Sequence, residues 1–115
     1  MQTRVLLLIR DRDLEILLRD YLPHAGFQIA PARTRDEAAN VAQKGLADVV
    51  LAECERCGEL APILGESSVP VVTLSDFGRP ESCLDGRCSR VLTKPASLRT
   101  ICEALAGLAQ PQPHP

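Results

Sequence analysis

Short apolar runs alternate with segments of helical periodicity along this chain. Val5–Ile9 is continuously apolar, which is typical of a strand buried on both faces of a sheet. Comparable short runs predict further strands at 27–30, 49–52, 69–74 and 90–93. Strands that alternate with helical segments favour a parallel sheet covered by helices on both faces.

The helical segments between these runs have recognisable ends. Apolar residues at helical spacing predict a first helix over 13–22, which Pro23 and Gly26 would end, with Leu14, Leu17, Leu18, Tyr21 and Leu22 on its buried face. Either Asp11 or Asp13 could cap this helix.

Two later helices also carry capping signals. Thr34 and Glu37 have capping-box spacing, which predicts a second helix that ends at Gly45. Ser97 is expected to cap the last helix, whose apolar face is Leu98, Ile101, Cys102, Leu105 and Leu108. Between them, 58–67 leaves room for a short helix, in which Pro62 fits only the first turn. The stretch 76–87 has room for one or two helical turns.

Length and composition limit the class of protein. With 115 residues, 45% of them hydrophobic, the chain predicts one globular domain over 1–109, and the proline-rich residues 110–115 read as a tail or the start of a linker. A net charge of −2 without a basic run argues against direct nucleic-acid binding. The apolar runs are too short to span a membrane, so we expect a cytoplasmic protein.

Candidate chemistry lies where the predicted strands end, because ligands of such sheets gather at the carboxyl ends of the strands. The segments to consider are 9–13, 53–57, 75–78 and 94–95. Five cysteines, an odd number without disulfide-scaffold spacing, are read as reduced thiols. A zinc or thiol-redox module built on Cys54, Cys57, Cys83 and Cys88 stays open as an alternative, although the spacing of the second pair is loose.

From Arg4 to Ala109 the chain resembles the receiver domain of bacterial two-component response regulators. In that family the first strand ends in two acidic residues, the third in an Asp that accepts phosphate, the fourth in Ser or Thr and the fifth in Lys-Pro. The matching positions here are Glu53 for the acceptor, Ser75 for the hydroxyl, and Lys94 with Pro95. The resemblance implies a three-layer α/β/α sandwich with flavodoxin-like receiver topology, in which the third and fourth helices are shortened.

The acidic pair of the family has no match. Counting back from Gly26 puts Ile9 and Arg10 at its positions, and a slip of one residue would supply only Asp11. In the family, Mg²⁺ held by these acids neutralises the like charges that phosphoryl transfer brings together. We therefore expect no metal site. If Arg10 and Lys94 both point at Glu53, an ion cluster takes its place, and a surface charge at Arg10 stays open as the alternative.

The resemblance then implies a degenerate, or pseudo-, receiver: a non-enzymatic, cofactor-free interaction module. Its partner would be a signalling protein, its own effector domain or a second copy of the chain. The aromatic switch position of the family is Val91 here, so rotation of a ring cannot carry the signal. Arg99 and Glu103, on the polar side of the last helix, are the candidate interaction face. A working phosphoreceiver that uses Glu53 or a neighbouring acid stays open as the alternative.

Overall fold

The protein is represented by a computed structural model, and the structure describes residues 2–53, 60–75 and 89–109. A five-stranded sheet runs through its centre in the order β2-β1-β3-β4-β5, and every neighbouring pair is parallel. The strands are β1 (Thr3–Leu8), β2 (Phe27–Ile29), β3 (Val49–Glu53), β4 (Val71–Ser75) and β5 (Arg90–Thr93). This order confirms the predicted flavodoxin-like topology.

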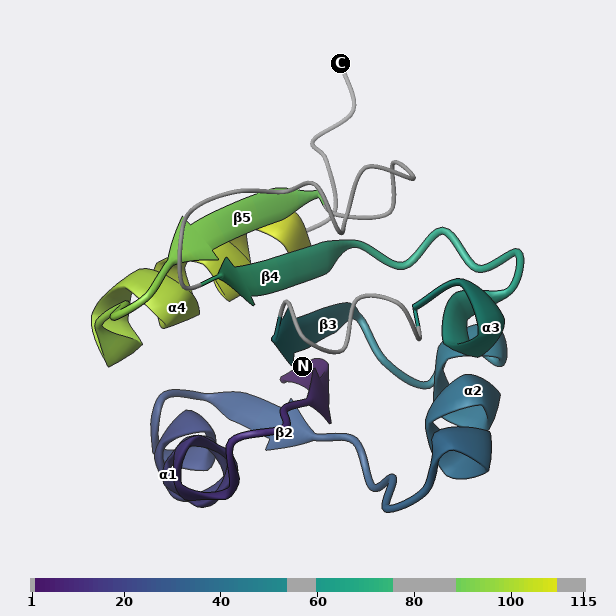
Figure 1. The fold of residues 1–115 in the computed structure, drawn as a ribbon, viewed down its shortest axis with the longest axis horizontal. Coiled ribbons are helices and arrows are strands. Elements are labelled where there is room, and N and C mark those ends of the chain that lie inside the picture. The colour runs from purple at the N-terminus through teal and green to yellow at the C-terminus, as the bar shows by residue number, and fades with distance from the viewer. Residues whose placement is uncertain (1, 54–59, 76–88, 110–115) are drawn as a thin grey trace.

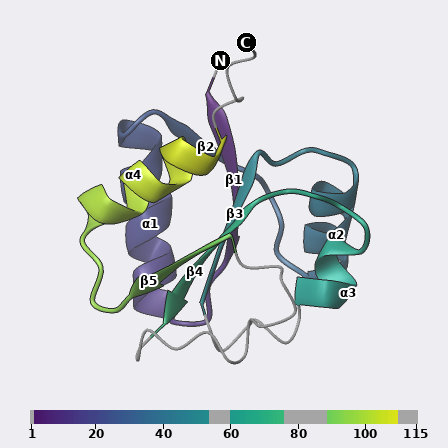
Figure 2. The ribbon, with the colours of Figure 1, turned by 90° about the horizontal axis from the view of Figure 1, so that it is seen from above.

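Helices cover both faces of the sheet, as Figures 1 and 2 show. α1 (Arg12–His24) and α4 (Leu98–Ala109) pack on one face, and α2 (Arg35–Gln43) and α3 (Leu60–Leu64) pack on the other. Because strand side chains alternate in direction, Leu6 and Leu8 join the α2–α3 core while Val5 and Leu7 join the α1–α4 core. The uninterrupted apolar run of β1 therefore serves two hydrophobic cores, and the three-layer sandwich is confirmed.

The strand ends differ from the sequence-based prediction by one or two residues. β1 begins at the polar Thr3 because Thr3 and Arg4 pair with Phe27 and Gln28 of β2, and it ends before Ile9. β3 extends to Glu53, which pairs with Leu74. β4 is shifted to Val71–Ser75 and β2 stops before Ala30, whereas β5 is as predicted.

Helix α1 corrects two details of its prediction. Asp11 is the N-cap, and the helix continues through Pro23 to His24 because the N–H groups of Ala25 and Gly26 still reach carbonyls of the last turn. Leu17 is 46% exposed, in contrast to the fully buried Leu18. Adjacent residues on a helix point about 100° apart, so these two leucines face solvent and core respectively.

The capping signals of the other helices are confirmed. Thr34 and Glu37 form a reciprocal capping box at α2, which ends at Gln43 with Lys44 as its C-cap; Gly45 follows with φ +70°. Ser97 Oγ accepts a hydrogen bond from the Thr100 N–H at the start of α4. α3 has only five residues, as the expected shortening requires. The predicted fourth helix and the tail fall in 76–88 and 110–115, outside the described residues.

Cys102 and the apolar face of α4 match their prediction in part. Ile101 and Leu105 are buried, whereas Leu98, Cys102 and Leu108 are half-buried and pack against the same core.

Within the described ranges, no helix has the length and apolar character that a membrane span requires.

Truncation of two adjacent leucines tests the face of α1 that packs on the sheet. Leu18→Ala should lower the free energy of unfolding by about 2–5 kcal/mol, because it leaves a cavity in the core. Leu17→Ala, the matched control on the exposed side, should change it by less than about 0.5 kcal/mol. Urea unfolding followed by circular dichroism measures both, and equal losses would contradict this orientation.

Candidate functional site

The carboxyl ends of β1 and β3 meet at the centre of the sheet, where the strand order reverses direction. Leu8 pairs with Ala52, so the turn from Ile9 to Asp11 lies beside Glu53, the last residue of β3. Glu53 is only 2% exposed. A buried carboxylate requires compensating donors, and its surroundings therefore decide what this site can do.

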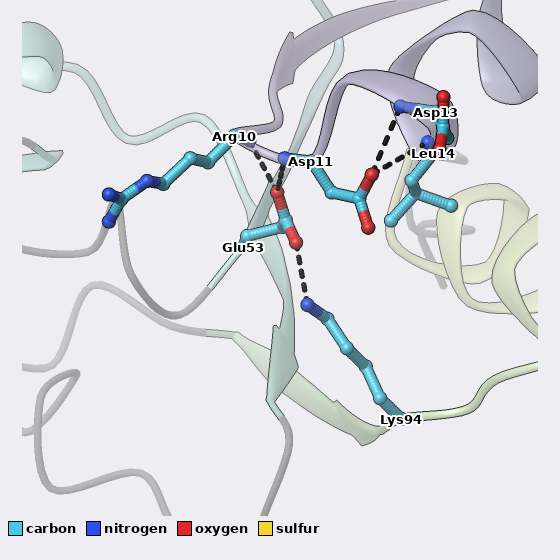
Figure 3. Close-up of polar contacts among 6 residues, drawn as sticks. All are labelled: Arg10, Asp11, Asp13, Leu14, Glu53 and Lys94. Carbon is cyan, nitrogen blue, oxygen red and sulfur yellow. Dashed lines mark hydrogen bonds and ion pairs between the residues drawn. The ribbon is translucent and has the colours of Figure 1, made fainter.

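Three donors surround the Glu53 carboxylate (Figure 3). Oε1 accepts hydrogen bonds from the backbone N–H of Arg10 and, at 2.6 Å, from that of Asp11. Oε2 forms an ion pair with Lys94 Nζ at 2.6 Å. Charge-assisted hydrogen bonds of this kind are the strong ones in proteins, so both oxygens are firmly held.

Opposing influences act on the ionisation of Glu53. Burial is the largest and disfavours the charged form, but Lys94 and the two backbone N–H groups outweigh it and hold the pKa below its ordinary value. The carboxylate is therefore ionised at neutral pH, and the site contains a paired negative and positive charge.

Lys94 comes from the chain after β5, the edge strand that lies two strands away from β3. It follows β5 directly, and its N–H donates to the Ser75 carbonyl at 2.7 Å, which fixes the chain at the end of β4. The Lys94–Pro95 peptide bond is cis. The contact between Lys94 Nζ and Glu53 Oε2 that the sequence suggested is present.

The second contact of the ion cluster, between the Arg10 side chain and Glu53, is not formed. The Arg10 side chain points away from Glu53, and Arg10 contributes only its backbone N–H (Figure 3). Sequence reasoning missed the two backbone donors, because every residue except proline carries an N–H and no residue type marks the ones that converge. Helix α1 begins immediately after this turn, which gives the chain the direction that aims both N–H groups at β3.

Asp11, the remaining acid at the end of β1, is engaged elsewhere. Its Oδ1 accepts hydrogen bonds from the N–H groups of Asp13 and Leu14, at 3.0 and 3.2 Å, and so caps α1 (Figure 3). Two further acids follow the ends of β3 and β4 in the sequence, Glu55 and Asp76, and both lie outside the described residues.

The described residues at this site do not fit a divalent cation. The side chain of Ile9 supplies no ligand atom, both oxygens of Glu53 already face N–H donors, and Asp11 Oδ1 faces the helix. Mg²⁺ prefers oxygen ligands in octahedral geometry, and two backbone N–H groups lie against Oε1 of the carboxylate that would bind it. Across residues 2–53, 60–75 and 89–109, no cluster of three or more acidic, histidine or cysteine side chains has metal-binding geometry.

The remaining candidate residues of the described part of the chain belong to β4, β5 and α4. Ser75 ends β4 and is 3% exposed. Val91 is half-buried in β5 and pairs with Thr73. Arg99 and Glu103 lie on the exposed side of α4 and pair with each other at 3.4 Å. Cys54, Cys57, Cys83 and Cys88 are outside the described residues, so the zinc or redox alternative is not tested.

Solved structures with this sheet and helix arrangement were compared with the chain. It superposes on the receiver domain of sensor histidine kinase PA1611 from Pseudomonas aeruginosa with a TM-score of 0.73 and 16% identity, covering 95% of this chain and 98% of that one. For chemotaxis protein CheY4 from Vibrio cholerae the TM-score is 0.70 with 20% identity, and the coverage is 94% and 99%.

This chain has the receiver fold. A third such structure is the response regulator TrrA from Thermotoga maritima in complex with Mg²⁺ and BeF, with a TM-score of 0.70, 19% identity and coverage of 93% and 99%. No sequence-family profile matches the chain, and no curated protein does either. The receiver fold therefore rests on three-dimensional similarity, while the site at Glu53 is described from its own contacts.

Removal of the Lys94 charge tests the ion pair within this receiver fold. Lys94→Met should lower the free energy of unfolding at neutral pH by about 3 kcal/mol, because it leaves a buried carboxylate without its counter-charge. Lys44→Met replaces the other lysine of the chain, which is exposed, and should cost less than about 0.5 kcal/mol. If both variants unfold at the same urea concentration, Lys94 does not stabilise Glu53.

Acid titration tests the ionisation of Glu53. A depressed carboxyl pKa contributes stability that is complete above the ordinary value of 4.5 and is lost as pH falls through the lower pKa of the folded state. Glu53→Gln should therefore be less stable than the natural protein at neutral pH, and the difference should shrink on acidification. Urea unfolding at a series of pH values measures it, and parallel curves for the two proteins would contradict the assignment.

Proposed function

We propose that this chain is an atypical receiver, a pseudo-receiver, that acts in signal transduction by contacting another protein and does not use Mg²⁺-dependent aspartyl phosphorylation. On this proposal it is a cytoplasmic, non-enzymatic module. Its partner is a signalling protein, its own effector domain or a second copy of the chain.

The observation that carries the proposal is the occupation of the Glu53 carboxylate. Two backbone N–H groups lie against Oε1 and Lys94 lies against Oε2, so a metal ion or a phosphorus atom would have to displace donors that already hold both oxygens. An acceptor also requires neutralisation of the incoming phosphate charge, which the family achieves with a metal held by two acids. Ile9 and Arg10 supply no carboxylate for that purpose.

The same contacts support a fixed, metal-independent state of the site. An ion pair at about 4 Å gains on the order of 4 kcal/mol at an effective dielectric of 20, and the desolvation of both charges offsets much of it. Breaking the pair is nevertheless costly, because it strands a charge in the core. Val91 adds support, since a small aliphatic side chain has no ring to rotate.

Exposure to a phosphate mimic tests the proposal. The purified chain should show no saturable change in its ¹H–¹⁵N NMR spectrum on addition of Mg²⁺ with beryllofluoride or acetyl phosphate. A variant with Arg10→Asp and Glu53→Asp should gain a Mg²⁺-dependent response, because it restores carboxylates at the ends of β1 and β3. This variant shows that the assay can detect binding.

Two results would contradict the proposal. One is a set of saturable shifts at Glu53 or Ser75 in the natural sequence. The other is covalent phosphate on Glu53, or on an acid near it, found by mass spectrometry after incubation with acetyl phosphate. The second result would establish the working phosphoreceiver instead.

A further inference from the structure

A groove rich in arginine lies beside the Glu53 site, between the first turns of α1 and the loop that joins β2 to α2. Its volume is about 870 Å³. The residues that line it, which we call the arginine groove, are Arg10, Arg12, Glu15, Arg19, Pro31, Ala32, Arg33 and Glu37. The four arginines outnumber the two glutamates by two, on a protein whose net charge is −2.

Both glutamates of the arginine groove are engaged locally. Glu15 pairs with Arg19 at 3.3 Å, one helical turn away. Glu37 accepts hydrogen bonds from the N–H groups of Arg33 and Thr34, at 2.7 and 3.1 Å, as part of the capping box of α2. Among the described residues, neither carboxylate forms an ion pair with Arg10, Arg12 or Arg33.

Three arginines of the groove have no ion-pair partner among the described residues. Across the part of the chain that the structure describes, Arg10, Arg12 and Arg33 form no ion pair, and all three are exposed. They come from three local structures: the β1–α1 turn, the start of α1 and the β2–α2 loop. Guanidinium groups are planar forks that match carboxylates and phosphates, so this arrangement is suited to a ligand with several negative charges.

A second hollow adjoins the first and is mainly apolar. Its volume is about 630 Å³, and it shares Arg19 and Pro31 with the arginine groove. Its apolar lining includes Pro23, Phe27, Ile29 and Leu46, of which Leu46 is 45% exposed. It follows β2, the edge strand of the sheet, which Figure 1 shows between α1 and α2.

We propose that these two hollows together bind an extended acidic segment of a partner protein, with an apolar side chain next to its acidic residues. The inference rests on the proposed function, because it names the kind of partner that this receiver fold would contact. The acidic residues would pair with Arg10, Arg12 and Arg33, and the apolar side chain would pack beside Leu46. Fork-shaped pairing fixes the orientation of the segment, and the apolar contact adds burial.

The two-part character of the surface favours a peptide over a small anion. A free phosphate compound would use the arginine groove and leave the apolar hollow empty. Nucleic acid is disfavoured by the overall negative charge and by the absence of an exposed aromatic side chain from the described lining.

Fluorescence anisotropy with a labelled probe tests the proposal. The probe is a synthetic peptide in which two leucines precede a run of glutamates. Arg12→Ser combined with Arg33→Ser should weaken its binding by at least roughly tenfold, because it removes two guanidinium groups that would pair with the acidic residues. Lys44→Ser combined with Arg90→Ser removes the same charge at exposed residues that line neither hollow, and should change binding less than about twofold. Leu46→Ser should weaken it about fivefold.

The outcomes separate the possible ligands. The proposal would be overturned if the probe did not bind, or if the two double variants lost the same affinity for it. A different outcome would indicate a site for a small phosphate compound instead of a peptide. Sodium triphosphate would then bind through Arg12 and Arg33, the peptide would bind no more tightly than triphosphate, and Leu46→Ser would have no effect. The peptide assay uses no Mg²⁺ or phosphodonor, so a negative result in it would not contradict the proposed metal-independent state. Conversely, a saturable response to beryllofluoride would contradict that state and would not bear on peptide binding at the groove.

Discussion

The Glu53 carboxylate joins three parts of the chain that are far apart in sequence. It accepts hydrogen bonds from the turn after β1, it closes β3, and it pairs with the lysine that follows β5. Each partner would be destabilising without the others, since a buried charge is tolerated only when donors and a counter-charge surround it. The geometry of this edge of the sheet depends on that mutual compensation.

The topology of the sheet makes the compensation possible. In the order β2-β1-β3-β4-β5 the chain leaves β1 toward one edge and returns on the other side at β3, so the carboxyl ends of β1 and β3 lie together. β4 and β5 follow β3 in the sheet, and the Lys94 side chain extends from the end of β5 to Glu53 at the end of β3. The receiver fold supplies a site of this shape, and the side chains decide whether it accepts a metal and phosphate or an internal ion pair.

The distribution of charge gives the two parts of this edge different roles. At Glu53 the negative charge of the carboxylate is matched by Lys94 within the protein. In the arginine groove the cations exceed the anions, and the local glutamates already serve α1 and α2. A module whose phosphate site is internally neutralised would need another surface for recognition, and the neighbouring groove provides one with a defined chemical preference.

The sequence by itself determined the strands, the capping of α2 and α4 and the positions of Glu53, Ser75 and Lys94, because these follow from local periodicity, hydrogen-bonding side chains and spacing. It did not show that Leu17 faces solvent, that α1 passes Pro23, or that Arg10 turns its side chain away. Nor did it bring Arg12 and Arg33 together, since the many arginines of the chain gave no sign of which would converge. Only the tertiary structure decided these points, because the direction of a side chain or a backbone N–H depends on the packing of segments that are distant in sequence.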